Sequence, residues 1–153
     1  MIRVEHIEAD DDRFPDVLAL DTQLLGEAPP SADTEWWIAW DTEAQQIAGY
    51  AGARLLGDGC YFLSRAGVAK PYRGHGLQRR LIRARVRRGR QLSAWLIVTY
   101  TLPFNAASSN SLIAAGFRTY IPAVAYAGAN VVYWYHRGTR RRSTVDPLTH
   151  VIA

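Results

Sequence analysis

Ten residues near the middle of the chain, from Val68 to Leu77, join the end of an apolar segment to two glycines and the start of a helical pattern. A helix begins with backbone N–H groups that lack an intrahelical partner, and it carries partial positive charge there. Gly74 and Gly76 allow the positive φ values that let successive N–H groups converge on one anion. Arg73 adds a charged, bidentate donor beside them. The stretch therefore predicts a strand, a tight turn and a helix that bind phosphate, with pyrophosphate as the expected ligand.

Two other phosphate-binding motifs do not fit this stretch. A P-loop requires Gly-x-x-x-x-Gly-Lys-Ser/Thr, which occurs nowhere in the chain. A dinucleotide-binding fingerprint requires a third glycine where this chain has Arg79, followed at ribose distance by a strand-borne acidic residue, which is also missing. The turn therefore belongs to a different class of phosphate-binding motif.

The turn resembles the acyl-CoA-binding motif of the GNAT acetyltransferase superfamily, and the residues that carry the resemblance are Arg73-Gly74-His75-Gly76-Leu77-Gln78. The family pattern is Arg/Gln-x-x-Gly-x-Gly/Ala after a strand. Gln78 departs from it, because the family usually has Gly or Ala there. The backbone N–H that contacts phosphate is present whatever the side chain, so the departure leaves that contact intact.

A second block of residues strengthens the resemblance. Asn105, Ser108 and the later pair Gly116-Phe117 have the spacing of the family's Asn-x-x-Ala/Ser…Gly-Phe segment, a short helix that leads into a strand. The two blocks occur in the family's order. Together the resembling segments extend from about Tyr61 to Phe117.

The resemblance implies an α/β (α+β) protein with the GNAT fold. In that fold a central, mixed, mostly antiparallel twisted sheet of about six to seven strands is flanked by about four helices, and the fourth and fifth strands splay apart. Acyl-CoA lies in the gap, and an acceptor amine attacks the thioester directly, without a covalent enzyme intermediate. The implied activity is transfer of the acetyl group of acetyl-CoA to a primary amine of a small molecule, peptide or protein. Acetyl-CoA is then a cosubstrate, and no metal is implied.

The same resemblance assigns residues to the cofactor. The pantetheine arm would pair with backbone near Val68 and Lys70, the pyrophosphate would lie on the N–H groups of residues 73–78, and Asn105 and Ser108 would contact the pantetheine region. The predicted cofactor-binding residues are Val68, Lys70, Arg73, Gly74, His75, Gly76, Leu77, Gln78, Asn105 and Ser108.

The general acid is the weakest part of the resemblance. Many family members have a tyrosine directly after the position that matches Ser111, but this chain has Leu112 there. A departing thiolate is stabilised by a proton or a hydrogen bond, so another hydroxyl is required. The nearest candidates are Ser111, Tyr120 and Tyr126. The missing tyrosine also leaves open an alternative, a catalytically inactive GNAT-fold protein that binds CoA or nucleic acid in a regulatory role.

The general base is equally open. The family often uses a carboxylate on the fourth strand, yet residues 60–68 contain no Asp or Glu. We therefore expect water-mediated deprotonation of the amine, with the ammonium oriented by acids of the loop that lines the acceptor site in this fold: Glu27, Asp33 and Glu35. Surface acids without a catalytic role are the competing interpretation.

Length and composition indicate one domain of ordinary size. The chain has 153 residues, 48% of them hydrophobic, which is enough for a real core, and we expect a GNAT domain over residues 1–138 with a basic tail over 139–153. The single cysteine, Cys60, excludes an internal disulfide and is expected to be a small buried hydrophobe. A charged start and the lack of a membrane-length apolar run predict a cytoplasmic protein.

Charge is divided unevenly along the chain. Residues 1–58 hold 13 acids and three arginines, a balance of −10, while residues 59–153 hold 15 basic residues and one acid, a balance of +14. The second part favours an anion, and the first could attract a cationic acceptor such as an amine. Arginines exceed what CoA requires, so an acidic partner or nucleic acid stays a further interpretation, as does a homodimer; membrane association is not expected.

Hydrophobic periodicity predicts the secondary structure. Residues 77–89 are expected to form a helix with Leu77, Leu81, Ile82 and Val86 inside, and with its arginines outside. The first helix is expected to begin near Asp12 and to bury Phe14, Val17, Leu18 and one of Leu24 and Leu25. The predicted strands are 2–7, 36–41, 46–55, 60–68, 95–100, 117–124 and 131–137. The predicted helices are 12–25, 77–89 and 106–115, and Asn105 is expected to cap the last of them.

Overall fold

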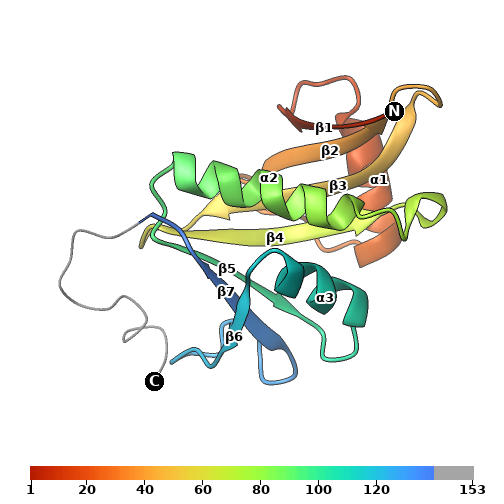
Figure 1. Cartoon of the computed structure of the whole chain (residues 1–153). Helices are drawn as coiled ribbons and strands as arrows, with labels where there is room; N and C mark the ends of the chain where they lie inside the picture. Colours follow the sequence, from red (N-terminus) through yellow and green to blue (C-terminus); the bar gives the residue numbers. More distant parts are fainter. Residues whose placement is uncertain (140–153) are drawn as a thin grey trace. The chain divides into compact units, whose positions relative to one another are not determined.

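A seven-stranded sheet forms the framework of the protein in the computed structural model, which describes residues 1–139 (Figure 1). The strand order is β1-β2-β3-β4-β5-β7-β6. The strands are β1 (Ile2–Ile7), β2 (Glu35–Asp41), β3 (Gln46–Leu55), β4 (Cys60–Val68), β5 (Leu96–Thr101), β6 (Arg118–Tyr120) and β7 (Val132–Arg137). The helices are α1 (Phe14–Leu25), α2 (Leu77–Gln91) and α3 (Ala106–Ala114), with one 3₁₀ turn, η1 (Lys70–Tyr72).

The sheet is mixed and mostly antiparallel, as predicted. β1 with β2, β2 with β3, β5 with β7 and β6 with β7 are antiparallel, whereas β4 and β5 are parallel, with Cys60 opposite Leu96. The bounds of β1, β3 and β4 are those predicted. The described residues have three α-helices and one 3₁₀ turn where about four helices were expected, because the segment between α1 and β2 contains Pro29 and Pro30 and forms a loop.

The described residues form two compact units. The first contains Met1–Arg54 and Leu63–Arg85, and the second contains Leu55–Phe62 and the chain from Val86 onward. Of the basic tail predicted from residue 139, all but Thr139 lies outside the described residues. No helix in the part of the chain that the structure describes is long and apolar enough to cross a membrane.

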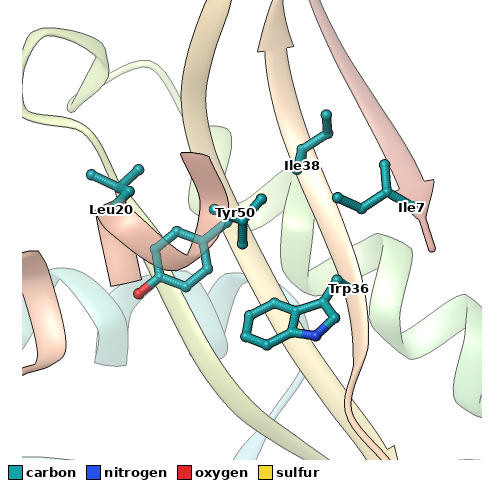
Figure 2. Packing of buried hydrophobic residues seen from close by; sticks show 6 residues of the cluster. Ile7, Leu20, Trp36, Ile38 and Tyr50 are labelled. Atoms are coloured by element: carbon teal, nitrogen blue, oxygen red, sulfur yellow. The ribbon is translucent and has the colours of Figure 1, made fainter. Parts of the chain in front are cut away.

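In the first unit, α1 packs on one face of the sheet. Val17 and Leu20 of α1 join Ile7, Trp36, Ile38 and Tyr50 in a buried apolar cluster (Figure 2). The prediction that Leu18 faces inward is wrong, since its side chain is 37% exposed. The buried stripe runs through Val17, Leu20 and Asp21, at helical spacings of three and four, and Leu18 lies off it. The helix also begins at Phe14, because Asp11 accepts hydrogen bonds from the Arg13 amide and guanidinium just before it.

A buried ion pair joins α1 to β4 in this unit. Arg65 Nη2 lies 2.7 Å from Asp21 Oδ2, and Arg65 Nε donates to Asp21 Oδ1 at 2.9 Å. The side chains are 15% and 4% exposed. Arg65 Nη2 also donates to the Ala28 carbonyl at 2.9 Å, so the same guanidinium holds the loop that follows α1.

The helix α2 follows its predicted pattern. Leu77, Leu81, Ile82 and Val86 are buried, and the arginines at 79, 83, 87 and 90 are exposed. The helix passes through Gly89, where it was expected to stop. A Cβ at Gly89 would lie 2.8 Å from Cδ1 of Tyr61, so glycine serves close packing here and does not end the helix.

The second unit contains β5, β7, β6 and α3. Cys60, Leu96, Val98, Tyr120 and Tyr133 form its apolar cluster, which confirms Cys60 as a buried hydrophobe. The predicted strand 117–124 is reduced to Arg118–Tyr120. Pro122 has no N–H to donate to a strand ladder, and after a single β-bridge at Pro122 the chain continues as a loop to β7.

We expect Arg65→Met to destabilise the protein by about 3–5 kcal/mol, because it leaves the Asp21 carboxylate buried without its charged partner. Urea unfolding followed by circular dichroism measures the change. The double variant Asp21→Leu/Arg65→Met removes both charges and is expected to restore most of the stability. If the free energy of unfolding of the single variant falls by less than about 1 kcal/mol, the pair contributes no more than a surface ion pair.

Candidate active site

The turn between β4 and α2 has the backbone geometry that its glycines predicted. Gly74 and Gly76 have φ values of +81° and +75°, which L-amino acids rarely adopt. A Cβ built at either glycine meets no atom within 4 Å, so the space beside the turn is open. The first helical bond runs from the Arg80 N–H to the Gly76 carbonyl at 3.2 Å. The amides ahead of it are therefore those that a helix leaves without intrahelical acceptors.

The turn is anchored to the β2–β3 hairpin by a tyrosine that the sequence did not mark. Tyr72 donates its hydroxyl proton to Asp41 Oδ2 at 2.8 Å and accepts from Gln46 Nε2 at 2.7 Å. The hydrogen bond from Tyr72 lowers the pKa of the Asp41 carboxyl, so this acceptor stays ionised. In addition, the Ala69 N–H donates to the Ala48 carbonyl at 2.9 Å. These bonds fix the position of the turn on its unit.

The side chains of the turn lie at the surface. Arg73 Nε donates to the Val68 carbonyl at 3.0 Å, and His75 Nδ1 lies 3.3 Å from the Tyr72 carbonyl oxygen. Lys70, Arg73 and His75 are exposed, whereas Leu77 is buried beneath the turn. All the predicted cofactor residues from Val68 to Gln78 are thus gathered in the first unit.

The residues of the turn fit an anionic ligand. The N–H groups of Gly74 and Gly76 make no hydrogen bond to another described residue. No Asp or Glu occurs in the sequence between Asp58 and Asp146, so the segment from β4 through α2 contributes only positive charge. Unengaged amides, a helix N-terminus and local arginines together suit a pyrophosphate.

The remaining predicted cofactor residues lie in the second unit, at the start of α3. Asn105 Oδ1 accepts from the Ser108 N–H at 3.1 Å, which makes Asn105 the N-cap of α3, as predicted. The amide group of Asn105 still has its two N–H donors for a ligand. Ser108 is half-buried in the first turn of the helix.

The hydroxyl candidates of this unit differ in what they can donate. Ser111 donates to the Ala107 carbonyl at 3.0 Å, so its proton is used within α3, and the neighbouring Leu112 is buried. The Tyr120 and Tyr126 hydroxyls lie 2.9 Å apart. Burial raises the pKa of both phenols, and the hydrogen bond from Tyr126 partly offsets this for Tyr120. Both phenols are protonated at neutral pH, and a single proton lies between them, so the pair retains one proton to donate.

Tyr120 is mostly buried but lines a pocket of about 840 Å³ in the second unit. Tyr133 and Tyr135 line the same pocket. The Tyr133 hydroxyl donates to the Gly128 carbonyl at 2.7 Å and accepts from the Ala127 N–H at 3.0 Å, which holds the loop that carries Tyr126. The geometry therefore favours Tyr120 over Ser111 as a donor.

The three candidate acids have different surroundings. Glu35 Oε2 lies 3.3 Å from His6 Nε2, and Asp33 Oδ2 lies 3.7 Å from Arg54 Nη1. Glu27 is exposed in the loop after α1. No local pattern identifies His6 and Arg54 as the partners of these acids. Among residues 1–139 no group of three His, Cys, Asp or Glu side chains could hold a metal ion.

Comparison with known protein families identifies the family that contains the β4–turn–α2 segment. The family model described as the acetyltransferase (GNAT) family matches residues 3–116. The chain belongs to the GNAT family. Its matched region includes every residue from the turn to the start of α3, so the sequence resemblance is confirmed.

Solved GNAT structures share the fold at low sequence identity. The ribosomal-protein-S18-alanine N-acetyltransferase of Escherichia coli is 12% identical and superposes with a TM-score of 0.74, over 95% of this chain and 99% of that one. A nourseothricin acetyltransferase is 16% identical (TM-score 0.68), and a Bacillus subtilis acetyltransferase in complex with CoA is 15% identical (TM-score 0.66); each alignment covers 90% of this chain and 99% of the other. A search of curated proteins found no match. These similarities establish the GNAT fold.

We expect Gly76→Asp to abolish binding of acetyl-CoA, because a carboxylate would occupy the open space beside the helix N-terminus and repel the pyrophosphate. Asp tolerates positive φ better than most residues, so the domain should stay folded. Calorimetric titration measures the affinity. Gly26→Asp is the matched control: Gly26 has φ +85°, open space around it and a place just after α1. If Gly76→Asp binds acetyl-CoA with the affinity of the wild type and of the control, the cofactor binds elsewhere.

Proposed function

We propose that the protein is an N-acetyltransferase that transfers the acetyl group of acetyl-CoA to a primary amine of a small molecule, peptide or protein. The observation that carries the proposal is the turn at Gly74 and Gly76, whose unengaged amides open at the start of α2 in a member of the GNAT family. The segment from β4 through α2 carries positive charge and contains no Asp or Glu, which supports a phosphorylated cosubstrate.

Acetyl-CoA binding follows from the groups around the turn. The amides of residues 74–78 would hold the pyrophosphate, with Arg73 and Lys70 supplying positive charge. The pantetheine arm would extend along the backbone near Val68. The Val68 carbonyl already accepts from Arg73 Nε, so the arm must share this oxygen or displace the guanidinium toward the phosphates. The sequence resemblance also assigns the Asn105 side-chain N–H groups and Ser108, which belong to the second unit, to the pantetheine region.

The proposed reaction is a direct attack on the thioester. A neutral amine forms the new C–N bond to the acetyl carbon, the C–S bond breaks, and CoA leaves as a thiolate that gains a proton or a hydrogen bond. Tyr120 is the proposed donor to the sulfur. The amine proton passes to water, and Glu27, Asp33 and Glu35 are candidates for orienting the ammonium beforehand. Cys60 packs in the apolar cluster of its unit, which argues against a covalent acetyl-cysteine route.

An inactive CoA-binding protein is the second candidate. It is favoured by Leu112, a buried apolar residue at the position where the family often has its acid. It differs from the enzyme in one measurable respect, because it binds acetyl-CoA but releases no CoA thiol in the presence of any amine.

The test combines turnover with intact mass. We expect the purified full chain to release CoA thiol from acetyl-CoA only when a suitable amine is added, and the chain's own mass to stay unchanged without acceptor. A panel of polyamines, amino sugars and lysine peptides is appropriate, since the net negative first part of the chain suits cationic acceptors. An added acetyl mass that chases into product would contradict direct attack. Binding without turnover across the panel would favour the inactive candidate.

We expect Tyr120→Phe to lower kcat by about a hundredfold or more and to leave the KM for acetyl-CoA near wild type, because it removes one hydrogen bond to the departing sulfur. Burial raises the pKa of Tyr120 above its ordinary 10.0, so the phenol stays protonated in mildly alkaline solution, and kcat should not fall between pH 7 and 9 on its account. Steady-state kinetics across pH measures both effects.

Tyr100→Phe is the matched control for this substitution. It also removes a tyrosine hydroxyl from the second unit, but its ring, stacked on Phe62 at 5.9 Å between centroids, is retained. Equal kcat values for the two variants would remove Tyr120 from the mechanism.

A further inference from the structure

The outer face of α2 carries a regular line of arginines. We call Arg79, Arg83, Arg87 and Arg90 the arginine row; they are spaced by four, four and three residues, and all four side chains are exposed. The 15 residues of α2 include seven arginines and no Asp or Glu. Since residues four apart lie on one side of a helix, the row forms a single stripe about 16 Å long.

The row has no partner in the part of the chain that the structure describes. None of its four arginines forms an ion pair or a hydrogen bond from its side chain to another residue there. Other arginines of the protein do have such roles: Arg80 donates to the Ile2 carbonyl at 2.9 Å, and the buried Arg85 donates to the Gly52 carbonyl at 3.1 Å. Like charges four residues apart destabilise a helix, so the row costs stability that a polyanion would restore.

The row exceeds what the proposed cosubstrate needs. The phosphate-binding turn lies at the N-terminal end of α2, and Arg83, Arg87 and Arg90 follow it by about two to four helical turns. A single pyrophosphate on the first amides therefore cannot engage the whole row. The remaining arginines suit a ligand with many phosphates arranged along a line.

We propose that the arginine row binds the phosphate backbone of duplex nucleic acid, without reading its sequence. Successive row residues are about 4.5 to 6 Å apart along the helix, and one duplex strand presents a phosphate every 3.4 Å of its axis, so the whole row can face phosphates. An α-helix also has the width that a duplex major groove admits. The proposal is independent of the acetyl transfer proposed above.

The chemistry of the face favours a duplex over other anionic partners. Single-stranded nucleic acid is held largely by aromatic stacking, and the exposed residues of α2 are arginines and Gln91, with no aromatic ring among them. Protein interfaces are centred on apolar and aromatic side chains, which this face also lacks. Phosphate contacts alone require only cations along a line.

The test is fluorescence anisotropy of a labelled duplex of about twenty base pairs, titrated with the full chain from about 50 to 200 mM salt. We expect Arg83→Gln/Arg87→Gln/Arg90→Gln to weaken low-salt binding by at least about tenfold. The slope of log Kobs against log salt should become shallower by about 0.9 for each phosphate that the variant leaves unneutralised, up to about 2.7 in total. The matched control, Arg3→Gln/Arg118→Gln/Arg137→Gln, removes the same charge from exposed positions on three strands and should retain most of the binding.

Three results would overturn the proposal. The wild-type chain could fail to bind the duplex at low salt, or the control could weaken as much as the row variant, which would make the effect one of net charge. Polyglutamate could also compete with the duplex at equal charge concentration, which would assign the row to an acidic protein. Circular dichroism and retained acetyl-CoA affinity establish that the row variant is folded, so its weaker duplex binding reports the row itself.

Discussion

The positive φ values of Gly74 and Gly76 are the constraint on which the proposed cofactor site depends. They let the chain turn from β4 into α2, and the N–H groups of both glycines make no hydrogen bond to another described residue. The turn can bind a ligand in a defined position only if its backbone is fixed relative to the neighbouring strands. Tyr72 fixes the turn, because its hydroxyl forms hydrogen bonds with Asp41 and Gln46 at the two ends of the β2–β3 hairpin turn. The glycines set the shape of the turn, and the tyrosine sets its position.

The site was predictable where its residues are neighbours in the sequence. The turn, the Asn105 cap and the inward face of α2 depend on local rules of glycine conformation, capping and helical period, and these predictions are confirmed. The bond between Tyr72 and Asp41 joins residues 31 apart, and that between Arg65 and Asp21 joins residues 44 apart. A single sequence carries no signal for such partners. Two predictions were wrong for a related reason. Leu18 was expected to be buried, but Asp21 lies on the buried stripe of α1 and Leu18 does not. The helix α2 was expected to end at Gly89, but Gly89 packs against the Tyr61 ring within the helix.

Arginines with three different physical roles occur among the described residues. Arg65 compensates a buried carboxylate, Arg80 and Arg85 donate to backbone carbonyls, and the arginine row faces solvent. Only the first two roles stabilise the fold through contacts of their own. The third adds repulsion along a helix that already has a complete apolar face in Leu77, Leu81, Ile82 and Val86. Because the arginine row does not stabilise the fold, its positive charge is more readily explained by binding of a ligand.

The tyrosine pair of the second unit limits the kind of acid catalysis that the proposed mechanism can use. A phenol whose pKa is raised by burial is a weaker acid than a thiol, whose ordinary pKa is near 8.5 in cysteine, so full proton transfer from Tyr120 to a CoA thiolate is uphill. Hydrogen-bond donation has no such cost and acts where negative charge develops on the sulfur. Tyr126 supports this role, because a proton donated from Tyr126 to the Tyr120 oxygen leaves the Tyr120 proton free for the ligand. The thiolate would then be stabilised in the site by Tyr120 and take its proton from water after release.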